Sequence, residues 1–270
     1  MTEVILVGEA FHGAKNFWEY KLDLIRQYHS KGILFDVGFE ADELGMESLK
    51  TKGVVALFDA FPKIFKTKQV AHIIRFCLDN DIPFFGFDPR GRINPDRIDR
   101  RLQQKAKRYQ NVYDTYFGTD EYFTIRDELM ANTICDHVKE SKKLQICLTA
   151  NLHIKKNGSK ENDARLRLKS IREYLDDERV STYSISQHSK KGNYLGIDLS
   201  KRSYEINDVF CIENLAVPGE IIQIKSDKID KQYGCYIFDH IRESDPACES
   251  YDEMIIHNCV SKPDIMNFIR

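Results

Sequence analysis

Long apolar runs, closely paired cysteines and a surplus of charge of one sign are all missing from this 270-residue sequence. No apolar stretch approaches the roughly 20 residues that a membrane-spanning helix needs, so we expect no membrane association. The 40 basic residues face 42 acidic ones, and the net charge of −2 argues against general nucleic-acid binding. The first residues also lack the basic region and the small-residue cleavage site of a signal peptide.

The seven cysteines form no Cys-x-x-Cys pair, and several lie inside apolar runs such as LQICLTA. Their odd number and their spacing suit neither a disulfide framework nor a cysteine zinc site. We interpret them as reduced, mostly buried thiols of a cytoplasmic protein. They are Cys77, Cys135, Cys147, Cys211, Cys235, Cys248 and Cys259.

The amino-terminal part follows a strand–helix–strand pattern. Val4–Val7 is a continuous apolar run before Gly8, which is typical of a strand buried on both faces of a parallel sheet. Residues 14–30 have helical apolar spacing, Gly32 ends the helix, and 33–40 is a second apolar run. The pattern predicts one βαβ unit with a right-handed crossover.

The rest of the chain extends this pattern. We expect strands at 82–88 and 144–150, and helices within 41–80 (broken near Phe61-Pro62), 95–114, 119–142 and 162–176. After Val180, short β-branched and aromatic runs predict a mixed or antiparallel extension of the sheet. We therefore predict a single α/β domain over residues 1–270, with a central, largely parallel sheet flanked by helices. Residues 1–178 form its motif-bearing βα part and 179–270 its β-rich part.

Ionisable and polar side chains follow four of the predicted strands, at the edge where an open α/β sheet binds its ligands. An unpaired carboxylate is costly to bury, so such a cluster must be paired, hydrated or functional. Each member could instead have a structural role, such as capping a helix. The residues are Glu9, His12, Glu40, Asp88, Asn151 and His153.

Five segments, in this order, resemble the erythromycin-esterase-like family. GEAFHG and the helix after it match the family's Gly-Glu-x-x-His-Gly motif, and ILFDVGFEAD and FFGFD match its next two strands. IRDELMAN matches a helix that carries Arg126 and Asp127, and LTANLHIKKNG matches a strand that ends in Asn151 and His153. The order and spacing agree over roughly residues 3–160.

The resemblance implies hydrolysis of an ester by water, without a covalent intermediate, in a site that needs no cofactor. By resemblance, His12 is the general base, and Glu9, Glu40 and His153 complete the site. These residue types suit the chemistry, because a neutral imidazole titrates near pH 6.5 and a carboxylate can orient it. A second histidine or a cation can stabilise the carbonyl oxygen.

Six further residues are expected to bind substrate or support the site: Lys21, Asp88, Arg90, Arg126, Asp127 and Asn151. The family usually has arginine at the position of Lys21, which leaves the role of this lysine open. Arg126 and Asp127 are expected to form a buried ion pair that orients the site. The basic segment from Arg90 predicts a solvated helix face, or else a rim that attracts an anionic substrate.

The segment between Asp88 and Arg126 is short, so we predict a member without a large helical cap, acting on a substrate smaller than a macrolide. Two alternatives remain open. The first is a metal-dependent hydrolase, with Glu9, His12, Glu40 and His153 as ligands of zinc or manganese. The second is a non-catalytic module that binds a small ligand on the same fold. The sequence does not predict an oligomeric state. The other histidines are interpreted as structural or surface groups: His29, His72, His137, His188, His240 and His257.

Overall fold

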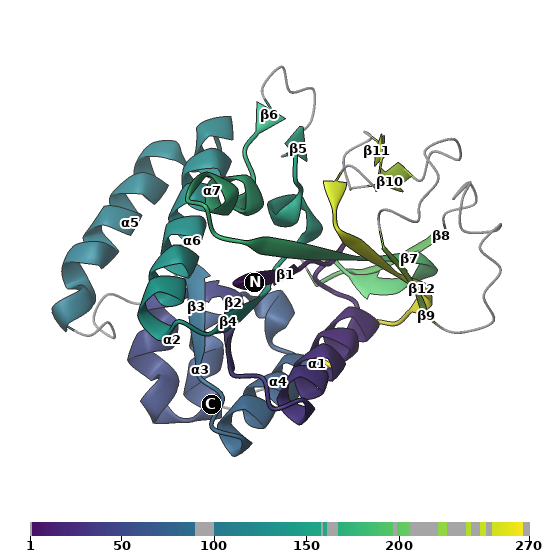
Figure 1. The fold of residues 1–270 in the computed structure, drawn as a ribbon, viewed down its shortest axis with the longest axis horizontal. Coiled ribbons are helices and arrows are strands. Elements are labelled where there is room, and N and C mark those ends of the chain that lie inside the picture. Colours follow the sequence, from purple (N-terminus) through teal and green to yellow (C-terminus); the bar gives the residue numbers. More distant parts are fainter. Residues whose placement is uncertain are drawn as a thin grey trace.

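The computed structural model describes residues 2–89, 100–157, 159–160, 167–196, 199–205, 221–225, 236–238, 244–246 and 250–266. Within these residues the centre of the fold is an eight-stranded sheet (Figure 1). Its order is β3 (Phe84–Asp88), β2 (Phe35–Asp42), β4 (Leu144–Leu148), β1 (Val4–Val7), β7 (Thr182–Leu195), β12 (Glu253–Val260) and β9 (Ile221–Lys225), with β8 (Lys201–Glu205) also on β7.

The strands from β3 through β12 are parallel to one another, whereas β9 and β8 pair antiparallel with β12 and β7. The α/β class and the largely parallel sheet are therefore confirmed. Two short antiparallel pairs lie outside this sheet: β5 (Ser159–Lys160) with β6 (Arg167–Leu168), and β10 (Tyr236–Phe238) with β11 (Ser244–Pro246).

Helices cover both faces of the sheet. The α-helices are α1 (Lys15–Ser30), α2 (Glu43–Leu49), α3 (Val54–Leu57), α4 (Lys68–Asp79), α5 (Gln103–Tyr116), α6 (Asp120–Ser141) and α7 (Ile171–Asp177). The 3₁₀ helices are η1 (Lys50–Lys52), η2 (Phe58–Ala60), η3 (Lys63–Phe65), η5 (Arg100–Leu102) and η6 (Asn151–Ile154).

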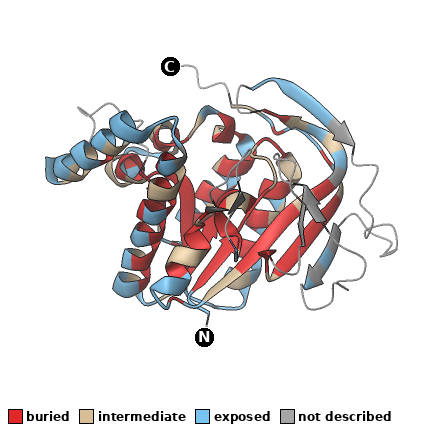
Figure 2. Ribbon diagram, turned by 90° about the horizontal axis from the view of Figure 1, so that it is seen from above, coloured by how far each residue is buried: buried red, intermediate tan, exposed pale blue. Residues whose placement is uncertain are grey.

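Side chains on the two faces of β1 pack into two different layers of the core. Ile5 and Val7 belong to a cluster with residues of α1 to α4, whereas Val4 and Leu6 pack in a cluster with residues of α6 and α7. Successive side chains of a strand point to opposite faces, so a strand between two helical layers must be apolar throughout. Figure 2 shows the central strands buried and the outer faces of helices exposed.

The first βαβ unit agrees closely with the expectation. The first strand and the first helix have nearly the predicted bounds, and Gly32 has a positive φ of 67° just after α1. The strand expected at 82–88 begins at Phe84, because Pro83 has no N–H to donate to a neighbouring strand. Beyond β2, Asp42 caps α2 by accepting a 2.7 Å hydrogen bond from the N–H of Gly45.

The helix expected over 162–176 is wrong at 167–170, whereas 162–166 lies outside the described residues. The helix α7 begins at Ile171, and β5 pairs with β6 just before it. Ser170 and Glu173 form a capping box, in which each side chain accepts a hydrogen bond from the other residue's N–H. This Ser-x-x-Glu pattern therefore identifies the start of α7, which the spacing of charged residues did not.

Two further expectations change in the second half of the chain. The helix expected over 95–114 is found as α5, preceded by η5, while 90–99 lies outside the described residues. Of the short runs expected as separate strands after Val180, the first two, VSTYSIS and GNYLGID, instead contribute to one long strand, β7, while 197–198 lies outside the described residues. Among the helices of the described part, none is both long and apolar enough to cross a bilayer.

Candidate active site

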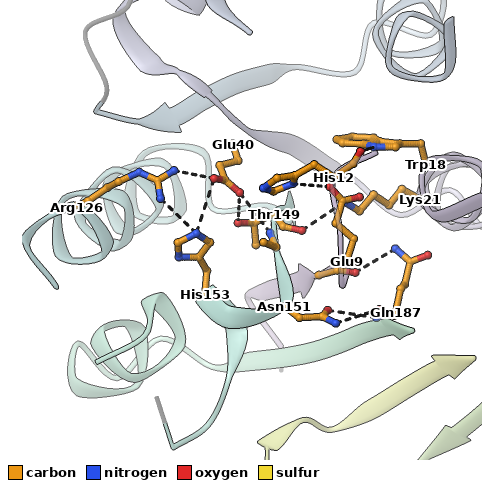
Figure 3. Close-up of polar contacts among 12 residues, drawn as sticks. Glu9, His12, Trp18, Lys21, Glu40, Arg126, Thr149, Asn151, His153 and Gln187 are labelled. Carbon is orange, nitrogen blue, oxygen red and sulfur yellow. Dashed lines mark hydrogen bonds and ion pairs between the residues drawn. The ribbon is translucent and has the colours of Figure 1, made fainter. Parts of the chain in front are cut away.

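Nine of the ten predicted site residues lie around the ends of β1, β2, β3 and β4. Glu9 and His12 follow β1, Glu40 lies near the end of β2, and Asp88 ends β3. Asn151 and His153 form part of η6 after β4, Arg126 and Asp127 come from α6, and Lys21 comes from α1. The tenth, Arg90, lies outside the described residues, as do residues 91–99 of the basic segment that follows it. Figure 3 shows most of this cluster in close-up.

Glu9 joins Lys21 and His12 into one chain. His12 Nδ1 lies 2.8 Å from Glu9 Oε1, and Lys21 Nζ donates a 2.8 Å hydrogen bond to Glu9 Oε2 (Figure 3). A carboxylate only accepts, so the proton of the neutral imidazole belongs on Nδ1 and the lone pair on Nε2. Within the described part of the chain, Nε2 has no hydrogen-bond partner. The His12 side chain is 21% exposed, whereas that of Glu9 is fully buried.

Lys21 compensates the charge of Glu9 in a buried setting. Its ammonium also lies 4.1 Å from the centroid of the Trp18 ring and 3.4 Å from the carbonyl oxygen of Thr149. Burial lowers the pKa of Lys21, although the carboxylate of Glu9 opposes this shift. An arginine fork can occupy both oxygens of a carboxylate. A lysine takes one, and this leaves Oε1 of Glu9 for His12.

Arg126 joins the other side chains of the site. Its guanidinium donates two parallel 3.0 Å hydrogen bonds to the two oxygens of Asp88, and one of 2.6 Å to Oε1 of Glu40. Burial opposes the charge on Arg126, but the carboxylates of Asp88 and Glu40 outweigh it and raise the pKa of the guanidinium. Arg126 therefore remains a fixed, buried cation at neutral pH.

His153 is bonded at both ring nitrogens. Its Nδ1 lies 2.9 Å from Asp127 Oδ2, and its Nε2 lies 3.3 Å from Arg126 Nη1. Because a guanidinium can only donate, Nε2 must be the acceptor and Nδ1–H the donor to Asp127. Arg126 and Asp127 therefore do not form the expected pair with each other, and each bonds other members of the site. His153 and His12 each have a carboxylate at Nδ1, but Nε2 of His153 is bonded to Arg126 and its side chain is buried, whereas the side chain of His12 is partly exposed.

Thr149 connects the two halves of the cluster and was not predicted. Its carbonyl oxygen accepts from Lys21, and its hydroxyl donates a 2.8 Å hydrogen bond to Oε2 of Glu40. The N–H of Ala150 donates to the same oxygen at 3.3 Å. Both residues lie at the end of a buried strand, directly before the Asn-x-His segment. This position is the sequence feature that could have identified them as part of the site.

Two residues of β7 also reach the site, although the sequence there carries no recognisable motif. Asn151 Nδ2 donates a 3.0 Å hydrogen bond to the carbonyl oxygen of Gln187 and lies 3.3 Å from Nε2 of His188. His188, expected to be a structural or surface group, therefore contacts a site residue. Gln187 is fully buried.

The arrangement does not fit a metal-ligand set. Within the described residues, no group of three or more histidine, cysteine, aspartate or glutamate side chains could hold a metal ion. Arg126 already lies between Glu40, Asp88 and His153, and a guanidinium repels a second cation. We therefore derive no step through a metal from these side chains.

Three solved structures share this architecture. No protein-family model and no curated protein matches the sequence. A Bacillus cereus protein is 13% identical with a TM-score of 0.71, over 98% of this chain and 90% of that one. A succinoglycan biosynthesis protein has the same identity, coverage and TM-score. A mutant of the erythromycin esterase EreC, in its open conformation, is 11% identical with a TM-score of 0.66, over 99% of this chain and 93% of that one. The chain therefore has the erythromycin-esterase-like fold that its strand-end motifs predicted.

Proposed function

We propose that this chain is a hydrolase that cleaves an ester or lactone bond, or an amide bond, of a small, non-macrolide molecule. The nucleophile is a water molecule activated by His12, and no covalent intermediate forms. One observation carries the proposal: Nδ1 of His12 is held at 2.8 Å by the buried Glu9, while Nε2, on a partly exposed side chain, has no hydrogen-bond partner among the residues that the structure describes.

The chain Lys21–Glu9–His12 defines where the proton goes. As the water oxygen attacks the carbonyl carbon, its proton passes to the lone pair on Nε2 of His12. The imidazolium that forms keeps its Nδ1–H on Glu9, which stabilises the new positive charge. The same proton is then available for the leaving group.

Arg126 is the candidate for stabilising the carbonyl oxygen. Its Nη1 carries two hydrogens, and His153 Nε2 is the acceptor that the described residues offer to one of them. The guanidinium is held by Asp88 and Glu40 and does not need to reorient during the reaction. A preorganised donor of this kind stabilises developing negative charge better than mobile water does.

The surroundings of His12 favour water over a covalent nucleophile. A covalent route needs a serine, threonine or cysteine within hydrogen-bond reach of the base. In the described part of the chain, the His12 ring contacts the carboxylate of Glu9 and the ring of Phe65, 4.8 Å away between centroids. Neither is a nucleophile of that type.

Two further points support the proposal. The fold is similar to that of an erythromycin esterase, whose activity is hydrolysis. The four described cysteines are free, with Cys77, Cys135 and Cys147 buried and Cys259 exposed, and such free thiols support our proposal of a cytoplasmic location.

The test is hydrolysis of a panel of small esters, lactones and amides. Wild-type protein is compared with His12→Ala and with His72→Ala, which removes an exposed histidine of α4. We expect His12→Ala to lose about 10²–10⁴-fold in turnover, the usual contribution of a general base. The His72→Ala control should retain wild-type activity, and EDTA should leave turnover unchanged.

Each other outcome rejects a part of the proposal. Full activity of His12→Ala rejects His12 as the base. If EDTA abolishes turnover, the mechanism is metal-assisted hydrolysis and not activation of water by His12. If none of the three proteins hydrolyses any compound of the panel, the result favours a ligand-binding module. A thermal-shift screen of the same compounds detects such binding.

A further inference from the structure

Gln187, in the middle of β7, holds the segment that carries Glu9. We propose that Gln187 is a positioning residue, which keeps Glu9, and through it His12, in the geometry that activates water. This inference rests on the proposed function, although the contacts that support it do not.

The backbone on both sides of Glu9 is bonded to Gln187. The side-chain Nε2 of Gln187 donates a 3.1 Å hydrogen bond to the carbonyl oxygen of Gly8. The carbonyl oxygen of Gln187 accepts a 3.0 Å hydrogen bond from the N–H of Ala10. The carbonyl oxygen of Glu9 itself accepts from the N–H of Asn151 at 2.9 Å. The position of the Glu9 carboxylate is thus determined by β7 and η6.

A second histidine fixes the orientation of the Gln187 amide. Because Nε2 of Gln187 donates to Gly8, its Oε1 must be the acceptor for Nε2 of His257, 3.3 Å away. His257 is buried on β12 against the rings of Phe17 and Tyr20. Burial lowers the pKa of His257 to about 4, so the ring is neutral at physiological pH and donates from Nε2.

Asn151 locks the backbone of Gln187 against Gly8. Asn151 Nδ2 donates to the carbonyl oxygen of Gln187 at 3.0 Å, and the N–H of Gln187 donates to Asn151 Oδ1 at 3.3 Å. A Cβ at Gly8 would lie 2.4 Å from Asn151 Oδ1, so there is no free space between these residues. A substitution of the Gln187 side chain removes its hydrogen bond to the carbonyl oxygen of Gly8, next to Glu9. The effect reaches His12 through a single side chain, since Glu9 Oε1 lies 2.8 Å from His12 Nδ1.

The experiment compares Gln187→Met and Gln187→Glu with Ser189→Ala. Methionine has a similar length but no amide, and glutamate presents only acceptors to the carbonyl oxygen of Gly8. Ser189 is the matched control, because it is two residues along the same strand and its buried hydroxyl has no hydrogen-bond partner within the described part of the chain. Nitrogen-15 NMR of histidine-labelled protein measures the tautomer of His12 and the solvent exchange of its Nδ1–H, and thermal unfolding measures stability.

We expect solvent exchange of the His12 Nδ1–H to become about tenfold faster in both Gln187 variants, as the hydrogen bond to Glu9 loosens. Turnover on the best substrate of the panel should fall on the order of 100-fold with little change in KM, the effect of a small misplacement of a catalytic group. Ser189→Ala should keep the wild-type exchange, turnover and KM.

The NMR measurement decides the inference independently of any substrate. If His12 exchange and tautomer stay as in the wild type in both Gln187 variants, Gln187 is not a positioning residue, whatever the turnover. If the wild type hydrolyses nothing, the proposed function fails while the exchange measurement still tests the positioning. If neither Gln187 variant folds, His257→Phe takes its place, because it removes only the donor to Oε1. Unchanged exchange in that variant overturns the inference, and exchange about threefold faster supports it.

Discussion

Replacing Lys21 with methionine leaves the carboxylate of Glu9 buried without its cation. Both side chains are fully buried, and their charged atoms lie 2.8 Å apart. Removing one partner of such a pair costs about 3–5 kcal/mol, because the remaining charge is desolvated and uncompensated. We expect the free energy of unfolding of Lys21→Met at pH 7 to fall by this amount. Turnover should fall as well, since Glu9 holds His12.

The double variant Glu9→Gln/Lys21→Met tests the reason for the loss. It removes both charges, and such replacements are often close to neutral, so we expect stability within about 1–2 kcal/mol of the wild type. Lys15→Met is the control on the same helix. The ion pair of Lys15 with Glu19 is solvent-exposed, so its loss should cost no more than about 0.5 kcal/mol.

Urea unfolding, followed by circular dichroism and by the fluorescence of Trp18, measures the wild type, Lys21→Met, Glu9→Gln, the double variant and Lys15→Met. Trp18 is the single tryptophan of the chain and lies against Lys21, so its emission reports on this part of the site. A loss below about 1 kcal/mol in Lys21→Met would refute the reasoning. So would an equal cost of Lys21→Met in the wild-type and Glu9→Gln backgrounds, because additivity means that the two side chains do not interact.

Three further predictions concern other parts of the site. His257 has a pKa of about 4 through burial, against about 6.5 when unfolded, so the unfolded state binds its proton first and stability falls as pH drops from 6.5 towards 4. Between pH 7 and pH 4.5, urea unfolding should show that the wild type loses on the order of 2 kcal/mol more stability than His257→Phe; an identical pH dependence of the two proteins would contradict the assignment. Gly8→Ala should lower stability by about 1–3 kcal/mol in thermal unfolding, because its Cβ would lie 2.4 Å from Asn151 Oδ1, and an unchanged Tm would show that the loop adjusts freely. Asp127→Asn should leave Nδ1 of His153 protonated, because Arg126 Nη1 donates to Nε2 and the asparagine oxygen can accept in place of the carboxylate; nitrogen-15 NMR of the ring that shows the proton on Nε2 would argue against this assignment.

The sheet and its reactive edge could be predicted because each depends on local sequence. A strand between two helical layers must be apolar throughout, so runs such as Val4–Val7 are visible without a structure. Parallel strands deliver their last residues to the same edge, so the strand-end positions of Glu9, Glu40 and His153 predicted that these side chains gather. The fold similarity followed from the same motifs.

The partners inside the cluster depend on geometry that no local pattern encodes. Adjacent residues Arg126 and Asp127 were expected to pair, but successive side chains on a helix point in different directions and reach different partners. Gln187 lies in a run of small and polar residues, SISQHS, where neither its burial nor its contact with Gly8 can be read. Such residues become visible only when β7 is placed beside β1.

The interior place of β12 has a consequence for how the protein is made. This strand lies between β7 and β9, although it follows both in the chain. During synthesis on the ribosome, the edge of β7 that later pairs with β12 over residues 185–192 lacks this partner strand until residue 260 has emerged. An unpaired edge of that length is a template for association with other nascent chains. A chaperone that covers this edge, or fast release of the finished chain, would therefore protect the nascent protein, and a stop codon before β12 would yield a product prone to aggregation.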